Sequence, residues 1–78
     1  MNMSHAEMAV QVIANISKTE AATITPDMEL VADLGMDSAR ALELLVELED
    51  KIGIEISDED AARLNTVGDI LGYLKKIS

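Results

Sequence analysis

The chain has 78 residues, of which 15 are acidic, 6 basic and 1 histidine, and its formal charge is −9. This balance argues against a nucleic-acid binder, which needs a net basic face to neutralise phosphates. The length predicts one domain over residues 1–78, with room for one small core but not for an enclosed active site as well. Cysteine is absent, which excludes disulfides and thiolate sites.

The other compositional features also narrow the class of protein. No run reaches the roughly 18 apolar residues of a membrane span, and no signal pattern opens the chain. The lack of cysteine fits a reducing cytosol, so we expect a cytoplasmic monomer. Phe and Trp are missing and Tyr73 is the only aromatic residue, which predicts an aliphatic core.

The first helix is predicted from a capping box. Ser4 and Glu7 have the spacing at which a hydroxyl and a carboxylate satisfy the free amides of a helix start. Apolar residues then recur at helical spacing as far as about Ser17; they are Met8, Ala9, Val12, Ile13 and Ile16.

A long connecting loop is predicted from Lys18 to Met36, because this segment has no helical period. Pro26 disfavours helix at Thr25, and Gly35 offers a turn. Loops of this length are uncommon in compact domains and are often functional. The expected inward anchors are Ile24, Leu30, Val31 and Leu34.

The strongest helical pattern follows this loop. Asp37 is placed as the N-cap, the helix runs from Ala39 to Ile52 with Ser38 in its first turn, and Gly53 ends it. One apolar stripe is expected to face the core; it comprises Ala41, Leu44, Leu45, Leu48 and Ile52. A second, smaller apolar set lies more than a quarter turn away among acids; it comprises Ala39, Leu42 and Val46.

Two further helices are predicted in the last third of the chain. A short one starts at the capping residue Ser57 and extends to about Arg63. The last one opens at Thr66, with Val67, Ile70, Leu71, Leu74 and Ile77 as its apolar stripe. No strand alternation is present. The predicted fold is all-α, a small bundle of three main helices plus one short helix, with a long loop between the first and second helices.

The negative charge is concentrated in the middle of the chain. Twelve acidic residues and only two basic ones, Arg40 and Lys51, lie between Asp27 and Asp60, for a local charge of −10. The remaining residues sum to +1. Such a segment is either a solvated face or a docking surface for basic partners, with electrostatic steering of the encounter. The apolar residues Leu42 and Val46 inside the acidic region favour docking.

Ser38 is the residue most suited to carry chemistry. The first turn of a helix offers free amides and the positive end of the dipole, which would favour a phosphodiester on the Ser38 hydroxyl. The alternative is that Asp37 and Ser38 are only a capping pair. A nucleophilic serine is disfavoured because it needs a base, and the only histidine, His5, is expected at the surface of another helix.

The segment from Asp33 to Ser38 resembles the D-L-G-x-D-S motif of acyl carrier proteins, in which the serine is esterified with phosphopantetheine. The segment from Ile52 to Asp60 and the opening at Thr66 are similar to the family in order and spacing. The resemblance implies that Ser38 would receive the phosphopantetheine arm from coenzyme A through a separate phosphopantetheinyl transferase, and that Asp37 would support that transfer. The arm's thiol would hold the cargo as a thioester, so the chain would act as a carrier and not as an enzyme.

The resemblance also implies two further sets of site residues. Basic patches on the transferase and on acyl-processing enzymes would bind the second helix, at Ala39, Leu42, Glu43, Val46, Glu47, Glu49 and Asp50. Part of the acyl chain would be sheltered in the bundle, in a cavity lined by Leu44, Leu48, Ile52 and Ile70. The pathway implied is fatty-acid, polyketide or specialised acyl metabolism. The helical pattern begins by Ser4 and ends by Ile77 without a linker, which predicts a free-standing carrier, although an excised domain would look similar.

Three residues depart from the family pattern. Ala39 stands where the family often has Leu, which affects the choice of partner, and Leu30 and Ile52 stand where Phe is frequent. The smaller side chains would leave a roomier interior unless their neighbours repack. Two other functions stay open: an acidic interaction module without a prosthetic group, and an aminoacyl or peptidyl carrier. Calcium binding at Asp58, Glu59 and Asp60 is disfavoured because the ligand order of an EF-hand loop is missing.

Overall fold

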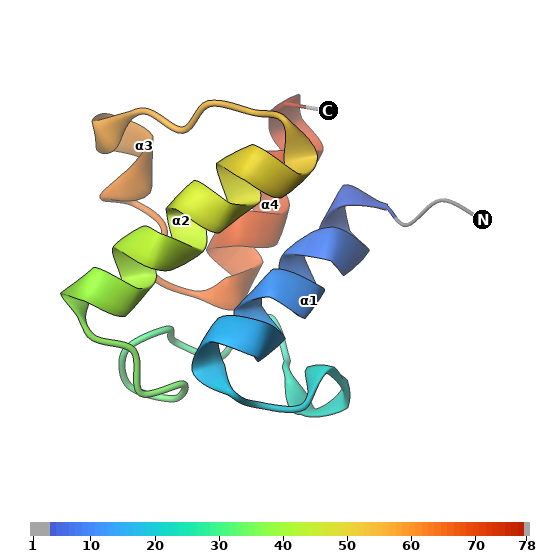
Figure 1. The fold of residues 1–78 in the computed structure, drawn as a ribbon, viewed down its shortest axis with the longest axis vertical. Coiled ribbons are helices and arrows are strands. Elements are labelled where there is room, and N and C mark those ends of the chain that lie inside the picture. Colours follow the sequence, from blue (N-terminus) through green and yellow to red (C-terminus); the bar gives the residue numbers. More distant parts are fainter. Residues whose placement is uncertain (1–3, 78) are drawn as a thin grey trace.

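The fold is a small helical bundle, seen in a computed structural model that describes residues 4–77. Its elements in chain order are α1 (His5–Ser17), η1 (Ala21–Thr23), α2 (Ser38–Ile52), α3 (Asp58–Ala61) and α4 (Val67–Ile77). Helix α1 packs against both α2 and α4, and the short α3 lies apart from α1 (Figure 1). The prediction of three main helices plus a short one is confirmed.

Helix α1 begins and ends as its sequence dictates. The Ser4 hydroxyl accepts the Glu7 amide at 3.1 Å, and the Glu7 carboxylate accepts the Ser4 amide at 3.2 Å. This reciprocal pair is the predicted capping box. At the other end Lys18 adopts the left-handed conformation, with φ of 57°. That conformation stops the helix and turns the chain into the long loop.

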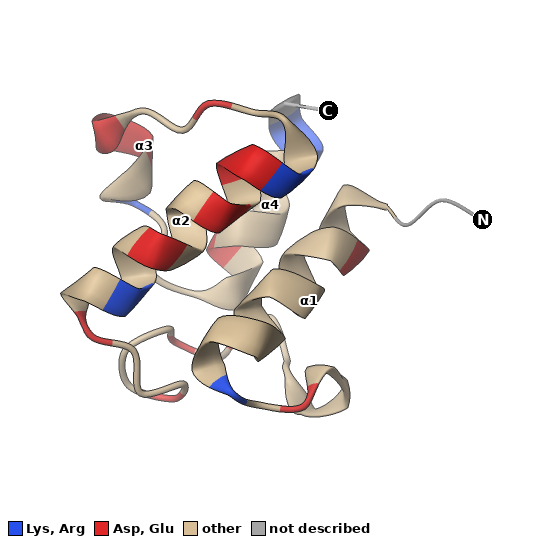
Figure 2. Ribbon diagram, viewed as in Figure 1, with Lys and Arg blue, Asp and Glu red and all other residues tan. Residues whose placement is uncertain are grey.

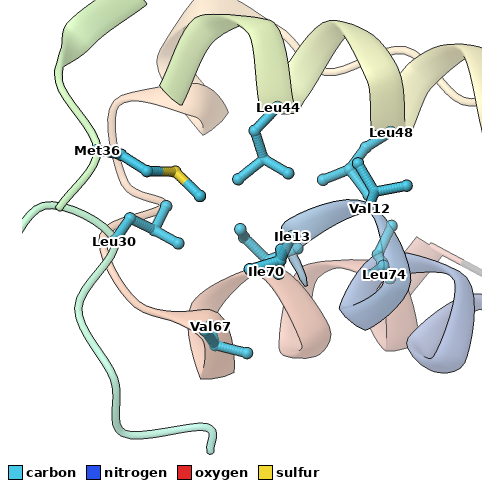
Figure 3. Close-up of a cluster of buried hydrophobic side chains, with 10 residues drawn as sticks. Val12, Ile13, Leu30, Met36, Leu44, Leu48, Val67, Ile70 and Leu74 are labelled. Carbon is cyan, nitrogen blue, oxygen red and sulfur yellow. The ribbon is translucent and has the colours of Figure 1, made fainter. Parts of the chain in front are cut away.

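The core is aliphatic, as the composition predicts. Its buried side chains come from all three main helices and from the loop, and they point toward one another (Figure 3). Leu44 and Leu48 of α2 and Ile13 of α1 are completely buried. The remaining members of the buried cluster are Ala9, Val12, Leu30, Met36, Val67, Ile70 and Leu74. Burial of these groups is the main favourable contribution to folding.

The loop from residue 18 to residue 37 differs from its prediction in two ways. It contains the 3₁₀ turn η1, which is too short to produce a periodic pattern and is closed by the bond from the Ile24 amide to the Ala21 carbonyl, at 3.2 Å. The expected anchors Leu30, Ile24 and Leu34 do pack on the core. The prediction for Val31 was wrong, because 65% of that side chain is exposed. Leu30 and Val31 lie in a turn, and the bond from the Leu30 amide to the Asn65 carbonyl directs Leu30 to the inward side.

Backbone hydrogen bonds fasten this loop to the start of α4. Glu29 and Thr66 form an isolated antiparallel bridge, in which the Leu30 amide donates to the Asn65 carbonyl at 3.0 Å and the Val67 amide to the Met28 carbonyl at 3.0 Å. The bridge pairs two irregular segments that are distant in sequence, so no strand pattern in the sequence predicts it. It fixes which loop side chains reach the core.

Gly68 allows the loop and α4 to approach closely. Its amide donates to the Pro26 carbonyl at 2.7 Å. A Cβ atom at position 68 would lie 2.9 Å from that same carbonyl oxygen. This is a steric clash that only a shift of the backbone could relieve. Gly72, one turn further along α4, has no atom within 4 Å of the equivalent Cβ position.

The two C-terminal helices begin at side-chain caps. Helix α3 ends at Ala61, two residues before the predicted Arg63, although the Arg63 amide still donates to the Asp60 carbonyl at 3.0 Å. Helix α4 starts at Val67, after a reciprocal cap in which the Asp69 amide donates to the Thr66 hydroxyl at 3.0 Å and the Asp69 carboxylate accepts the Thr66 amide at 3.1 Å. Backbone hydrogen bonds from Asn65 and Thr66 lower the pKa of Asp69.

Two glycine substitutions in α4 should therefore change stability in opposite directions. We expect Gly68→Ala to lower the free energy of unfolding by about 1–3 kcal/mol, because its methyl group overpacks the contact with Pro26. Gly72→Ala should raise that free energy by about 0.5–1 kcal/mol, because alanine is the better helix former and meets nothing. Urea denaturation of the two variants measures both. Equal effects would show that the contact at Pro26 is not tight.

Candidate functional site

The segment before Ser38 is a turn that is held in place by the buried side chain of Met36. Gly35 has φ of 67°, a conformation that favours glycine, and its amide donates to the Val31 carbonyl at 3.1 Å. The Met36 amide donates to the Leu30 carbonyl at 3.0 Å. Met36 itself is buried, with only 3% of its surface exposed. Burial of Met36 thus places Asp37 and Ser38 at the surface.

Asp37 and Ser38 form the start of α2, as predicted. The Asp37 carboxylate accepts the Arg40 amide at 2.8 Å, which is the bond of an N-cap. Ser38 is the first residue of the helix and is exposed. Its hydroxyl lies at the positive end of the helix dipole. This position suits a group with negative charge.

Arg40 fixes the start of α2 against the end of α1. Its guanidinium donates to the Ile16 carbonyl at 3.0 Å, across 24 residues of sequence. A cation is favourable at the C-terminal end of a helix, where carbonyls lack partners. Arg40 is exposed, but its guanidinium makes this intramolecular contact, so the start of α2, with Ser38, is positioned in part by α1.

A groove of about 490 Å³ lies beside Ser38, between α2 and α3. Its α2 wall comprises Ser38, Ala41, Leu42 and Leu45. The long loop contributes Glu29, Leu30 and Val31 to the lining. The opposite wall is formed by α3 and the residues after it, namely Asp58, Ala61, Ala62, Leu64 and Asn65. Most of these side chains are apolar, so the groove can hold an apolar group attached at Ser38.

The four residues predicted to line an acyl cavity lie elsewhere. Leu44, Leu48 and Ile70 are packed in the core with at most 1% exposure, and Ile52 is half-buried against it. The groove beside Ser38 is lined by other residues. The helical wheel identified the core face of α2, and the groove lies beside that face. That these four residues shelter an acyl chain stays a prediction.

The outward face of α2 combines acids with two exposed apolar side chains. Leu42 is 63% exposed and Val46 is 56% exposed. Ala39, Glu43, Glu47 and Asp50 are exposed around them, and acidic residues recur along α2 and on α3 (Figure 2). Val31 of the loop is also exposed and joins Leu42 at the groove. All the residues predicted to form the docking face are therefore exposed except Glu49, and their docking role stays a prediction.

Glu49 is engaged in an internal contact. It is half-buried, and its carboxylate accepts the Ile56 amide at 3.0 Å. The bond fixes the chain that leads from α2 to α3. This role could not be predicted from sequence, because the bond depends on where the chain returns after Gly53.

His5 is not placed to act on Ser38. It lies at the first residue of α1 and is half-buried, beside a hollow that it shares with Leu71 and Lys75 of α4. Ser38 is near the other end of α1, where Arg40 meets Ile16, so about 16 Å of helix separates the two positions. The described residues 4–77 thus give Ser38 no histidine base.

Tyr73 is a contact residue that the sequence did not single out. Its hydroxyl donates to the Asp60 carboxylate at 3.1 Å and lies 3.4 Å from the Glu55 carbonyl oxygen. Burial, then the hydrogen bond to Asp60 and the charges of Asp60 and Glu49 raise the pKa of the Tyr73 hydroxyl. The only available signal was that Tyr73 is the single aromatic residue of the chain.

Comparison with known proteins identifies the family to which this arrangement belongs. Residues 9–74 match the family model described as "Phosphopantetheine attachment site". The chain is 45% identical over 64 residues to an acyl carrier protein of Helicobacter pylori, covering 82% of each chain. The chain belongs to the acyl carrier protein family. Among residues 4–77 of this carrier-family protein, no helix is long and apolar enough to cross a membrane.

Other family members are similar in sequence and in structure. The meromycolate extension acyl carrier protein of Mycobacterium bovis is 42% identical over 67 residues, which are 86% of this chain and 58% of the relative. The chain thus spans little more than half the length of that relative. An acyl carrier protein of Enterococcus faecalis has a structure with a TM-score of 0.77 and 38% identity, covering 97% of this chain and 100% of that one.

Substitutions at Asp37 should separate its geometry from its charge. Asp37→Ala removes the oxygen that accepts the Arg40 amide, and we expect it to lower the free energy of unfolding by about 1 kcal/mol. Asp37→Asn keeps an accepting oxygen and should stay within a few tenths of a kcal/mol of the parent. Urea denaturation measures both. If asparagine destabilises as much as alanine, the negative charge at the dipole matters more than the cap.

Proposed function

We propose that this protein carries acyl groups as thioesters on a phosphopantetheine arm attached to Ser38. The proposal depends on one observation: Ser38 is exposed at the first turn of α2, beside an apolar groove. Membership of the acyl carrier protein family supports it. In this function the chain is a substrate of other enzymes and not itself a catalyst.

The attachment reaction fits the local chemistry. A separate transferase would take the Ser38 proton, and the Ser38 oxygen would form a bond to the phosphorus of the phosphopantetheinyl group. The pyrophosphate bond of coenzyme A would break, with adenosine 3′,5′-bisphosphate as the leaving group. The resulting phosphodiester would lie at the positive end of α2. The arm's thiol supplies the sulfur that this cysteine-free chain lacks.

The groove between α2 and α3 is the place we propose for the first part of the arm and cargo. Ala41, Leu42 and Leu45 line it next to Ser38, and Ala61, Ala62 and Leu64 face them. A deeper site among Leu44, Leu48 and Ile70 would require displacement of side chains that are already packed. The names of the relatives favour a fatty-acyl cargo over an aminoacyl or peptidyl one.

The outward face of α2 is the surface we propose for docking. Enzymes with basic patches would be attracted by Glu43, Glu47 and Asp50 and would bury Leu42 and Val46. These enzymes include the phosphopantetheinyl transferase and the enzymes that process the cargo. Ala39 supplies little apolar contact next to the arm, so partners that need a large side chain there would be disfavoured.

The attachment is tested by intact-protein mass. The parent protein incubated with coenzyme A and a broad-specificity phosphopantetheinyl transferase should gain one phosphopantetheinyl group, and Ser38→Ala should gain none. Circular dichroism should show that the variant is folded. No gain by the folded parent would contradict the proposal and would favour an acidic interaction module, in which Asp37 and Ser38 only cap α2.

The docking face is tested by charge reversal. At low salt, Glu43→Lys should reduce the association rate with the transferase by roughly a factor of three to ten, with the fold retained. Glu20→Lys makes the same change in net charge at an exposed position outside α2 and serves as the matched control. Stopped-flow measurements give both rates. Equal rates for the two variants would remove Glu43 from the docking face.

A further inference from the structure

Helix α3 is held in place by contacts from outside it. It has four residues, Asp58–Ala61, and none of them is buried. Three of the four are acidic. An element without buried apolar side chains has little packing energy of its own, and such elements open most readily. The position of α3 therefore depends on the bonds that reach it.

Within residues 4–77, side-chain hydrogen bonds from α2 and α4 connect α3 and the segment before it to the rest of the bundle, and one of them is the weak 3.4 Å contact from the Tyr73 hydroxyl to the Glu55 carbonyl. The Glu49 carboxylate of α2 accepts the Ile56 amide at 3.0 Å. The Tyr73 hydroxyl of α4 donates to the Asp60 carboxylate at 3.1 Å. Only this last bond reaches a side chain of α3 itself. Tyr73 packs its ring against the core, so the donor is fixed on α4.

The same helix forms one wall of the groove beside Ser38. Asp58, Ala61 and Ala62 line that wall, opposite Ala41, Leu42 and Leu45 of α2. The α2 wall belongs to a helix whose Leu44 and Leu48 are completely buried. Of the two walls, α3 is thus the one that can move, and its displacement changes the width of the groove.

We propose that the Tyr73 hydroxyl is a latch on Asp60 that fixes the distance between α3 and α2 and thereby limits the size of the group that the groove beside Ser38 admits. Tyr73 is then a positioning residue: it does not line the groove, and it determines which groups the groove admits by holding α3 in place. That the group is an acyl chain on a phosphopantetheine arm rests on the proposed function. The latch and the size limit do not depend on the proposed function, and both can be tested without the phosphopantetheine arm.

Hydrogen exchange of the unmodified protein tests the latch. Tyr73→Phe keeps the ring and removes the hydroxyl, and Asp60→Ala removes the acceptor. Each should speed exchange of the Ala61 and Ala62 amides by about 2- to 10-fold, the range of one lost hydrogen bond. Tyr73→Phe breaks the bond to Asp60 and also the contact with the Glu55 carbonyl. Asp60→Ala breaks only the first, so the double variant should exchange no faster than Tyr73→Phe alone.

A second hydroxyl serves as the control for this measurement. Thr23→Val removes the bond from the Thr23 hydroxyl to the Glu20 carbonyl, at 2.7 Å in η1, and should leave exchange in α3 unchanged. Additive effects of Tyr73→Phe and Asp60→Ala, or unchanged exchange in Tyr73→Phe, would overturn the latch.

A unique cysteine tests the size limit. The chain has no cysteine, so Ser38→Cys places a single thiol at the mouth of the groove. Its thiolate displaces methanesulfinate from methyl or decyl methanethiosulfonate and forms a mixed disulfide with the alkyl group. The melting temperature of the decyl adduct minus that of the methyl adduct measures how much of the longer chain is buried.

We expect Tyr73→Phe to increase this difference by about 4–8 °C, because an unlatched α3 admits more of the decyl chain. General destabilisation would lower both adducts alike and leave the difference unchanged. An unchanged or smaller difference in Tyr73→Phe would overturn the size limit. Failure of the transferase to modify Ser38 would contradict the proposed function alone, since the alkyl adducts need no arm.

Discussion

The apposition of the long loop and the start of α4 is the constraint on which the other features depend. The loop has little regular structure of its own, yet backbone bonds from Leu30 to Asn65 and from Gly68 to Pro26 hold it against α4. This pairing directs Leu30 and Met36 into the core. Once Met36 is buried, the next two residues are at the surface and begin α2. This pairing of the loop with α4, together with the bond from Arg40 to the end of α1, sets the position of Ser38.

Among the acidic residues, two groups differ in what their carboxylates contact. Glu7, Asp37 and Asp69 accept backbone amides at helix starts, and Asp33 and Glu49 accept amides of Glu29 and Ile56 in the loops. At the helix starts these carboxylates replace bonds that the backbone cannot make, and in the loops they fix the path of the chain. Glu43, Glu47 and Asp50 are exposed on α2. A formal charge of −9 therefore overstates the negative charge on the outward face of α2.

The helices and the position of Ser38 could be predicted because their signals are local. Capping residues such as Ser4 and Asp37 act within one turn, and the buried stripe of α2 follows from helical spacing alone. Leu30 and Val31 are adjacent and similar, and only the pairing with Asn65 decides which one is buried. The roles of Glu49 and Tyr73, and the lining of the groove by Ala61 and Ala62, depend on where α3 lies. That position is a tertiary property with no period in the sequence.

The single tyrosine has a practical consequence. Since the chain contains no Phe or Trp, its near-ultraviolet absorption, dichroism and fluorescence arise from one phenol ring. That ring donates its hydroxyl to a carboxylate of α3, and a neighbouring carboxylate acceptor alters the excited state of a phenol. The intrinsic emission of the unlabelled protein therefore reports the state of one contact, next to the groove, with no background from elsewhere in the molecule.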